Sequence, residues 1–328
     1  MSPRRLLLPL IALVLVLPGC LPSSSVSEPL RAVKLLLGFR PDVQFAPFYL
    51  AQEAGYFAEA GLEVTIEHSA DVLVLVADGR ADFGVADATD VMIARTSGIP
   101  VKYISTLYDR FPVALIGPAG TVPSDPAELA GLRIGTPGEF GSSWHALLAL
   151  LEAGGLTRDD VTIRAYPQFN QVEGLLNGDV DLITGFRSNE PLRLEAQGMS
   201  VDLLTIDEVA PLPGPGLIAG DELLSSDPAL ATAFATATLR AQQAIAADPQ
   251  VGLDAAVAAV PAIAEDRETA LAVLEATIEL WGGEPGAISG FIDPAVWGPG
   301  YGALERLGFI DGSVPPGDMV LDVLALPY

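Results

Sequence analysis

"ADGRADFGVADATD" (residues 77–90) and "LNGDVDLITGFRSN" (residues 176–189) are two copies of one local design. In each copy the end of an expected helix leads to a glycine, an aspartate three residues later and then a short apolar run. Gly79 corresponds to Gly178, and Asp82 corresponds to Asp181. A helix that returns to a short apolar strand is the repeating unit of α/β proteins. The repetition predicts a chain with two related α/β halves.

The same duplication extends toward the N-terminal side of both copies. "KLLLG" (34–38) and "LRIGT" (132–136) each lead through a loop into an expected helix, "FAPFYLAQEAG" (45–55) and "GSSWHALLALLEAGG" (141–155). Each helix closes with glycine, which favours the left-handed backbone found after helix ends, and a second strand follows it, "LEVTIEH" (62–68) and "VTIRAY" (161–166). Strands that alternate with helices at this spacing predict parallel sheets joined by right-handed crossovers.

The boundaries of the two lobes follow from two apolar segments flanked by proline and glycine. "VALIGP" (113–118) leads out of the first half and "PGLIAG" (215–220) leads out of the second, so we expect a hinge of two chain crossings. We assign residues 33–117 plus 219–328 to lobe 1 and residues 118–218 to lobe 2. Beyond residue 221 the apolar spacing predicts helices that pack on lobe 1, with helix starts at Asp227-Pro228 and Asp293-Pro294.

The N-terminus predicts export and a lipid anchor. Arg4 and Arg5 precede an apolar run that ends at Leu17 and is too short for a comfortable membrane span, which indicates a signal peptide over residues 1–19. Gly19 stands directly before Cys20, the single cysteine, as in a bacterial lipobox. We expect a lipidated Cys20 and a Ser/Pro-rich tether over residues 20–32. The alternative is an ordinary signal peptide with an unpaired cysteine.

Composition argues against several classes of function. The chain has 328 residues, half of them hydrophobic, and a formal charge of −25, which would repel nucleic acids over most of the surface. His68 and His145 have no metal-site spacing to acidic residues, so no metal and no cofactor are expected. A nucleophile at Ser142 or Ser143 with His145 would lack an orienting acid, so we expect no catalysis.

Candidate ligand contacts follow from the rule that ligands bind beyond the carboxyl ends of parallel strands. The loops at 39–45, 87–90, 137–143 and 186–190 are expected to face one cleft, and the glycine-rich "GTPGEFGSSW" (135–144) offers N–H groups and hydroxyls, or simply an N-cap at Ser142. Acids there could instead cap helices, and aromatic rings could fill the core. Phe169 and Asp90 belong to the same group of strand-end residues. The candidates are Phe39, Gln44, Phe45, Asp87, Thr89, Tyr108, Phe140, Ser142, Ser143, Asn170, Phe186, Asn189 and Glu190. Flat aromatic faces beside neutral and acidic groups suit an uncharged or donor-rich heteroaromatic ligand.

Three stretches carry a family resemblance: "GFRPDVQFAPFYLAQEAGYFAEAGLEV" (38–64), "GRADFGVAD" (79–87) and "SNEP" (188–191). They resemble the solute-binding proteins of ABC importers that are related to the thiamine-pyrimidine precursor binders. The resemblance implies the type II periplasmic-binding-protein fold, with two hinge crossings, a helical C-terminal tail and a ligand clamped between the lobes. It also implies a lipid-anchored monomer on the outer face of a bacterial cell membrane, which delivers its ligand to a permease and its ATPase.

Within this family, "VQFAPFYLAQ" with "SNEP" looks most like the riboflavin-binding branch. The resemblance carries over as ligand contacts Gln44, Phe45, Tyr108, Ser142, Ser143, Asn189 and Glu190. Alternative ligands are the aminopyrimidine precursor of thiamine and a sulfonate-type anion, for which Arg187 is the nearest cation.

An exported enzyme on the same fold is the alternative of another class. The family's fungal pyrimidine-synthesising enzyme depends on a cysteine-rich segment and on an active-site lysine and histidine. This chain has only Cys20 and, as lysines, Lys34 and Lys102. That difference favours transport.

Overall fold

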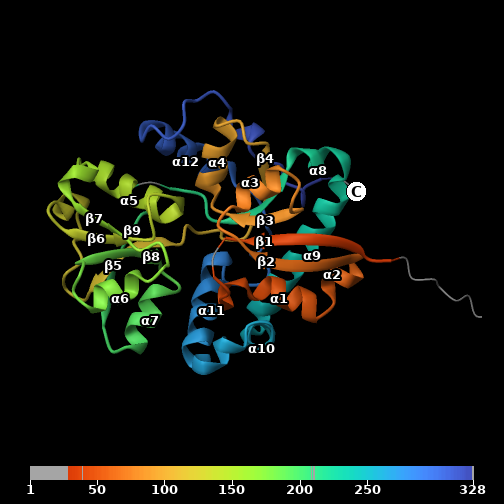
Figure 1. Cartoon of the computed structure of the whole chain (residues 1–328), viewed down its shortest axis with the longest axis horizontal. Coiled ribbons are helices and arrows are strands. Elements are labelled where there is room, and N and C mark those ends of the chain that lie inside the picture. The colour runs from red at the N-terminus through yellow and green to blue at the C-terminus, as the bar shows by residue number, and fades with distance from the viewer. Residues whose placement is uncertain (1–28, 39, 208, 210, 327–328) are drawn as a thin grey trace, which may run out of the picture.

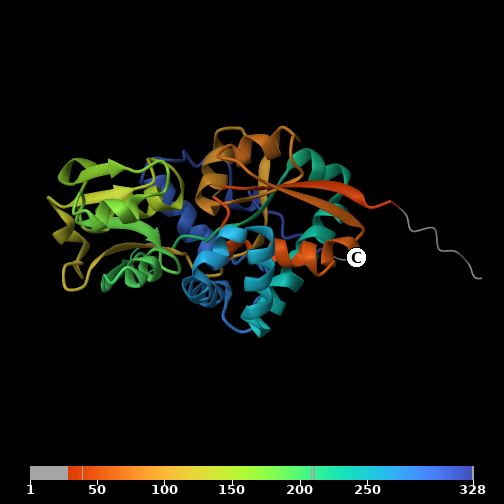
Figure 2. The ribbon, with the colours of Figure 1, turned by 60° about the horizontal axis from the view of Figure 1, so that its bottom comes forward.

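The computed structural model describes residues 29–38, 40–207, 209 and 211–326. The expected signal peptide, Cys20 and most of the tether lie outside these residues. The described chain forms two lobes, each built on a five-stranded sheet with helices on both faces (Figure 1). Figure 2, turned by 60°, shows the same separation of the lobes, with strands β5–β9 and helices α5–α7 in the smaller one. The α/β class predicted from the sequence is confirmed.

The first sheet has the strand order β2-β1-β3-β10-β4. Strands β1, β2 and β3 are parallel to one another, and β10 runs antiparallel to both of its neighbours. The bounds are β1 (Arg31–Leu37), β2 (Leu62–His68), β3 (Phe83–Ala86), β4 (Val101–Thr106) and β10 (Gly216–Gly220). The chain therefore enters lobe 1 at residue 31, two residues before the expected boundary.

The second sheet repeats this pattern with the order β7-β6-β8-β5-β9. Here β5 is the antiparallel member, paired with β8 on one side and β9 on the other. The bounds are β5 (Val113–Pro118), β6 (Arg133–Thr136), β7 (Thr162–Ala165), β8 (Leu182–Phe186) and β9 (Val201–Thr205). The duplicated stretches occupy equivalent places in the two sheets, since β3 follows Gly79 as β8 follows Gly178.

The pairing of β5 and β10 shifts both lobe boundaries from their expected positions. We assigned residues up to 117 to lobe 1, but β5 pairs only with strands of the second sheet, so the first crossing is the segment 107–112. The second crossing is the segment 206–215, because β10 already belongs to the first sheet from Gly216. An apolar strand beside a crossing fits either sheet by composition, and only its hydrogen-bond partners decide.

Helices cover both faces of the first sheet. An aromatic stack at the centre of one face joins this layer to the sheet: Phe234 lies between Phe83 and Phe57, with ring centroids 4.2 and 5.2 Å apart. The expected helix start at Asp227 is confirmed, because its carboxylate accepts a hydrogen bond from the Leu230 N–H and Pro228 is the first helical residue. The helices before the crossing are α1 (Ala46–Glu53), α2 (Tyr56–Glu59), α3 (Val72–Ala77) and α4 (Ala88–Thr96), and those after it are α8 (Asp221–Ser226), α9 (Pro228–Ala247), α10 (Pro249–Ala259) and α11 (Arg267–Trp281).

Lobe 2 has a smaller set of helices around its sheet: α5 (Gly141–Ala153), α6 (Gln171–Leu176) and α7 (Glu190–Ala196). Five short 3-10 helices complete the described chain: η1 (Val43–Phe45), η2 (Pro126–Leu129), η3 (Arg158–Asp160), η4 (Pro261–Asp266) and η5 (Pro316–Asp318). None of the described helices has the length and apolarity needed to traverse a lipid bilayer.

The last helix, α12 (Pro294–Arg306), contacts both lobes rather than lobe 1 alone. Asp293 caps it by accepting from the Ala295 N–H, as predicted. Trp297 and Leu304 pack into a core of lobe 1, whereas Ala303 packs into the core around α5 of lobe 2. The helix lies above the gap between the lobes (Figure 1). It carries apolar residues on two faces and therefore forms a third connection beside the two crossings.

Candidate functional site

The two sheets turn the carboxyl ends of their parallel strands toward each other, and a cavity of about 660 Å³ lies between the lobes. Lobe 1 contributes the segments after β1, β2 and β3, and lobe 2 contributes those after β6, β7 and β8. Cavities of this volume are typical of small-molecule sites. The cleft predicted from strand ends is therefore present in the structure.

Most of the predicted contact residues line this cavity. Thr89 does not, because it is fully buried at the start of α4, and Asn170 does not, because it is exposed at the start of α6. Phe39 lies outside the described residues. Those that line the cavity are Gln44, Phe45, Asp87, Tyr108, Phe140, Ser142, Ser143, Phe186, Asn189 and Glu190, and Asp90 and Phe169 do so as well.

Aromatic rings from both lobes face the cavity. Tyr108, in the first crossing, meets Phe186 at the end of β8 in an edge-to-face contact with ring centroids 6.1 Å apart. Phe45 meets His68 in the same way at 5.7 Å. Phe169 has φ = 56°, the only left-handed backbone among the described residues other than glycine. Such a conformation costs on the order of 1–3 kcal/mol and is characteristic of functional sites, so it indicates that the placement of this ring matters.

The first interlobe contact joins the start of α4 in lobe 1 to the start of α5 in lobe 2. The Ser142 N–H donates to Asp87 Oδ2 over 2.8 Å. His145 Nδ1 lies 2.9 Å from Thr89 Oγ1 and 3.7 Å from Asp90 Oδ1. His145 was considered above as a metal ligand and as a catalytic partner of Ser142 or Ser143, whereas here it ties the two lobes together. The buried Thr89 likewise serves the contact between lobes rather than the cavity.

Burial determines the charges of this contact. Burial raises the pKa of Asp90 to about 8, with a smaller contribution from the negative charge of Asp87. Burial also raises the pKa of Asp87, against the hydrogen bonds from Ser142, and lowers the pKa of His145 to about 4. At neutral pH the imidazole is therefore uncharged, and its approach to Asp90 is a polar contact rather than an ion pair.

The second interlobe contact lies on the other side of the cavity, between η1 of lobe 1 and α7 of lobe 2. Asn189 Nδ2 donates to Gln44 Oε1 over 2.7 Å, and Gln44 Nε2 lies 3.5 Å from Ser188 Oγ. Arg193 Nη2 donates to Asp42 Oδ2 over 2.7 Å, and Arg193 Nε also donates to Asn189 Oδ1. Arg193 thus joins the lobes directly through Asp42. It also orients the side-chain amide of Asn189, which donates to Gln44.

Glu190 closes the floor of the cavity at the end of β8. Its Oε2 accepts from the Phe186 N–H over 2.7 Å. Gly185 leaves the space for this, because a Cβ there would stand 2.8 Å from Glu190 Cγ. Burial raises the pKa of Glu190 to about 7. This carboxyl group is therefore near its titration midpoint at neutral pH and can accept or donate a hydrogen bond.

Sequence reasoning missed one wall of the cavity, the segment 69–74, which follows β2 and includes the first turn of α3. The strand-end rule could have found it, since β2 is parallel to β1 and ends at the same edge. Asp42 and Arg193 were also missed. No local pattern marks them, because their contact joins residues that are 151 positions apart.

Within the described ranges, no group of three or more His, Cys, Asp or Glu side chains could hold a metal ion. The arrangement at Ser142, Ser143 and His145 is not that of a nucleophile and its base. His145 Nδ1 instead faces Thr89 Oγ1, 2.9 Å away. The lining of the site offers hydrogen-bonding groups and aromatic rings.

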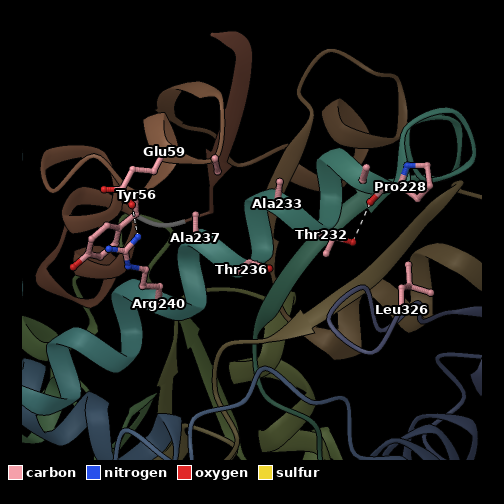
Figure 3. A pocket seen from close by; sticks show the side chains of 11 residues that line it. Tyr56, Glu59, Pro228, Thr232, Ala233, Thr236, Ala237, Arg240 and Leu326 are labelled. Carbon is pink, nitrogen blue, oxygen red and sulfur yellow. Dashed lines mark hydrogen bonds and ion pairs between the residues drawn. The ribbon is translucent and has the colours of Figure 1, made fainter. Parts of the chain in front are cut away.

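A second hollow, of about 670 Å³, lies on the outside of lobe 1 between α2 and α9. Figure 3 shows Ala233 and Ala237 on its floor, with Arg240 at one end beside Tyr56 and Glu59. Arg240 pairs with Glu59, and its guanidinium lies 3.9 Å from the centre of the Tyr56 ring. Small apolar side chains line this hollow and its cation is already paired, so the cavity between the lobes is the better candidate.

Comparison with known families agrees with the fold described above. The model of the family described as "NMT1/THI5 like" matches residues 42–251, which include the whole of lobe 2 and every segment that lines the cavity except the start of the loop after β1. The chain belongs to the NMT1/THI5-like family. The family resemblance predicted from the sequence is confirmed.

Relatives of this NMT1/THI5-like chain include binding proteins and synthases. It is 35% identical over 211 residues to the "Riboflavin-binding protein RibY" of Chloroflexus aurantiacus, covering 63% of this chain and 60% of that protein. It is 30% identical over 192 residues to a "4-amino-5-hydroxymethyl-2-methylpyrimidine phosphate synthase" of Uromyces fabae, covering 55% of each. The chain thus spans little more than half the length of these relatives.

Solved structures show the fold of this NMT1/THI5-like chain. The alkanesulfonate-binding protein SsuA of Xanthomonas axonopodis pv. citri, bound to MOPS, matches 89% of this chain and 98% of its own, with a TM-score of 0.68 and 15% identity. The periplasmic nitrate-binding protein NrtA of Synechocystis PCC 6803 matches 88% of this chain and 84% of its own, with a TM-score of 0.64 and 16% identity. The predicted two-lobed periplasmic-binding-protein fold is confirmed.

Proposed function

We propose that this protein is the substrate-binding lipoprotein of an ABC importer and that it captures riboflavin between its lobes. The observation that carries the proposal is the cavity of about 660 Å³, lined by aromatic rings of both lobes and by buried hydrogen-bonding groups. Riboflavin has a flat ring system that can stack on such rings and a chain of hydroxyl groups that can donate to carboxylates. Similarity to RibY over 63% of this chain supports this ligand.

Binding proceeds by closure of the hinge. A ligand that touches both lobes stabilises the arrangement in which they meet, and the two interlobe contacts add to that stability. The closed protein then presents its ligand to a membrane permease driven by an ATPase. No step of this role requires a change in the covalent structure of the ligand.

The aminopyrimidine precursor of thiamine is the second candidate ligand. Similarity to the pyrimidine phosphate synthases favours it, and the acidic cavity would accept hydrogen bonds from an amino group. A sulfonate-type anion is less favoured, because Arg187 does not line the cavity and its Nη1 is paired with Asp207 Oδ2 at 2.8 Å.

A binding panel tests the ligand. We expect riboflavin to lose fluorescence through stacking when the purified protein is added, and the protein to gain thermal stability by linkage, about 2.7 kcal/mol at a hundredfold excess over the dissociation constant. The pyrimidine precursor and an alkanesulfonate are the comparison ligands. No quenching and no shift with riboflavin, together with a shift with the pyrimidine, would replace the first candidate by the second. Recovered ligand of altered mass would indicate an enzyme.

The lipid anchor is tested separately at Cys20. We propose that the processed chain begins at this residue and is held at the outer face of the cell membrane. Cys20→Ala should move the protein from the membrane fraction to the extracytoplasmic soluble fraction of the producing cell, with ligand binding unchanged. An unchanged membrane fraction would refute the anchor.

A further inference from the structure

Helix α5 begins in the cleft without a cap from its own loop. Phe140, the residue before it, has no side-chain oxygen, and the nearby Glu139 turns outward to Arg158, with Oε1 and Nη2 2.8 Å apart. The first N–H groups of a helix lack intrahelical partners and carry a partial positive charge, so such an end attracts anions. The buried Ser142 and Ser143 belong to this end. The free N–H groups at the start of α5 therefore need hydrogen-bond acceptors from another part of the chain.

Carboxyl groups of the opposite lobe take the place of an anion at this helix end. Asp87 Oδ2 accepts from the Ser142 N–H over 2.8 Å, and Asp90 accepts from the Gly141 N–H. Gly141 permits this approach, because it has φ = 70° and a Cβ there would lie only 3.2 Å from Asp87 Oδ2. Two carboxyl groups of lobe 1 thus occupy the place at which a bound anion would sit on lobe 2.

Asp87 presents an acceptor oxygen to this helix end, as a bound anion would. Burial, and then the negative charge of Asp87, raise the pKa of Asp90 to about 8, so Asp90 is mostly protonated near neutral pH and adds little charge of its own. An acidic group of a ligand at Ser142 and Ser143 would meet the charge of Asp87 in a buried site. At a separation of about 4 Å and an effective dielectric constant of about 20, such repulsion weakens binding by about a hundred- to a thousandfold.

The rest of the cavity does not compensate for this charge. Among the described lining residues, Asp71 and Glu190 add two more acids, and Arg40 is the only arginine or lysine. Arg193 stands behind the cavity wall and is engaged by Asp42. The balance of charge around the cavity is therefore acidic.

We propose that Asp87, supported by Asp90, determines the ligand class of this protein: it holds the N-terminus of α5 with a built-in carboxylate and so excludes ligands that carry a sulfonate, phosphate or carboxylate group there. The ligand is accordingly neutral or a hydrogen-bond donor where it meets Ser142 and Ser143. The inference rests on the proposed role of the cleft as a binding site, but it does not depend on riboflavin being the ligand.

The test compares ligands that differ by one anionic group. Riboflavin is compared with its 5′-phosphate by fluorescence titration, and ethanesulfonate is titrated by calorimetry at up to millimolar concentration. We expect the wild type to bind riboflavin at least about a hundredfold more tightly than the phosphate and to bind no ethanesulfonate. In Asp87→Ala/Asp90→Asn the preference should shrink at least tenfold, and ethanesulfonate should bind. Both acids are changed because the charge of Asp87 helps to keep Asp90 protonated. If Asp87 alone were replaced, Asp90 would ionise more readily and restore a negative charge at this helix end.

Glu139→Gln is the matched control, since it removes an equal charge near the same helix end but outside the cavity. It should leave the preference within about threefold. Wild-type protein that binds ethanesulfonate, or both flavins equally, overturns the inference and leaves riboflavin capture standing. Wild-type protein that binds neither flavin overturns the riboflavin proposal, while the ethanesulfonate titrations still decide the inference. If circular dichroism shows the double variant unfolded, Asp87→Asn/Asp90→Asn replaces it, and an unchanged preference there also overturns the inference.

Discussion

Arg193→Ala should open the cleft. The guanidinium of Arg193 joins α7 of lobe 2 to Asp42 of lobe 1 at 2.7 Å and also holds the amide of Asn189, which donates to Gln44. The Asp42 side chain is 5% exposed and that of Arg193 is 35% exposed. Removal of the arginine leaves a buried carboxylate with one fewer partner on the far lobe, and it frees the amide that completes the second interlobe contact.

The magnitude follows from the exposure of the pair. A hydrogen bond to a charged group contributes about 1.5–3 kcal/mol, and the partial exposure of Arg193 places this one near the lower end, about 1.5–2 kcal/mol. At 1.4 kcal/mol for each factor of ten, the closing equilibrium falls by about 10- to 30-fold. Because the ligand needs the closed form, its dissociation constant rises by the same factor when closure limits binding.

Two measurements check this prediction. Fluorescence titration gives the dissociation constant, and small-angle X-ray scattering of the ligand-free protein shows a larger radius of gyration for the variant. Arg164→Ala is the control, because its partner Asp179, 3.2 Å away, lies in the same lobe. It should change affinity by less than about twofold. Unchanged affinity and unchanged scattering for Arg193→Ala would show that this contact does not hold the lobes together.

Three further predictions concern stability. Phe234→Ala removes the central ring of the stack at 4.2 and 5.2 Å and should lower the unfolding free energy by about 3–5 kcal/mol in urea, so a change below 1 kcal/mol would contradict the stacked core. Gly214→Ala would place a Cβ 2.3 Å from Tyr108 O, where the two crossings touch, and should cost about 1–3 kcal/mol in thermal unfolding, whereas Gly286→Ala, with open space around it, should be neutral. The raised pKa of Asp90, about 8, means that the folded protein holds this proton more tightly than the unfolded chain. Its contribution to stability is complete below the unfolded pKa and is lost as pH rises through 8. The melting temperature should therefore fall as pH rises from the unfolded pKa of 3.8 to about 8 and should level off above that value, and a fall of equal size in Asp90→Asn would assign it to other groups.

Local patterns were enough to predict the elements and the position of the cleft. Gly79 and Gly178 mark equivalent helix ends, and the apolar runs after them become β3 and β8 in equivalent places of the two sheets. Because parallel strands end at one edge, residues such as Gln44 and Ser142 could be assigned to the cavity from their order along the chain. The same rule placed Asn170 there in error, since its neighbours Phe169 and Gln171 line the cavity instead.

The sequence by itself determined the α/β elements, the duplication and the acidic charge, because each depends on residues close together in the chain. Only the tertiary structure decided that β5 joins the second sheet, that α12 contacts both lobes and that Asp87 meets the Ser142 N–H. These features depend on hydrogen bonds and packing between distant segments, such as the 55 positions between Asp87 and Ser142. Periodicity and spacing carry no information about such distances, whereas the folded chain brings these groups to 2.8 Å.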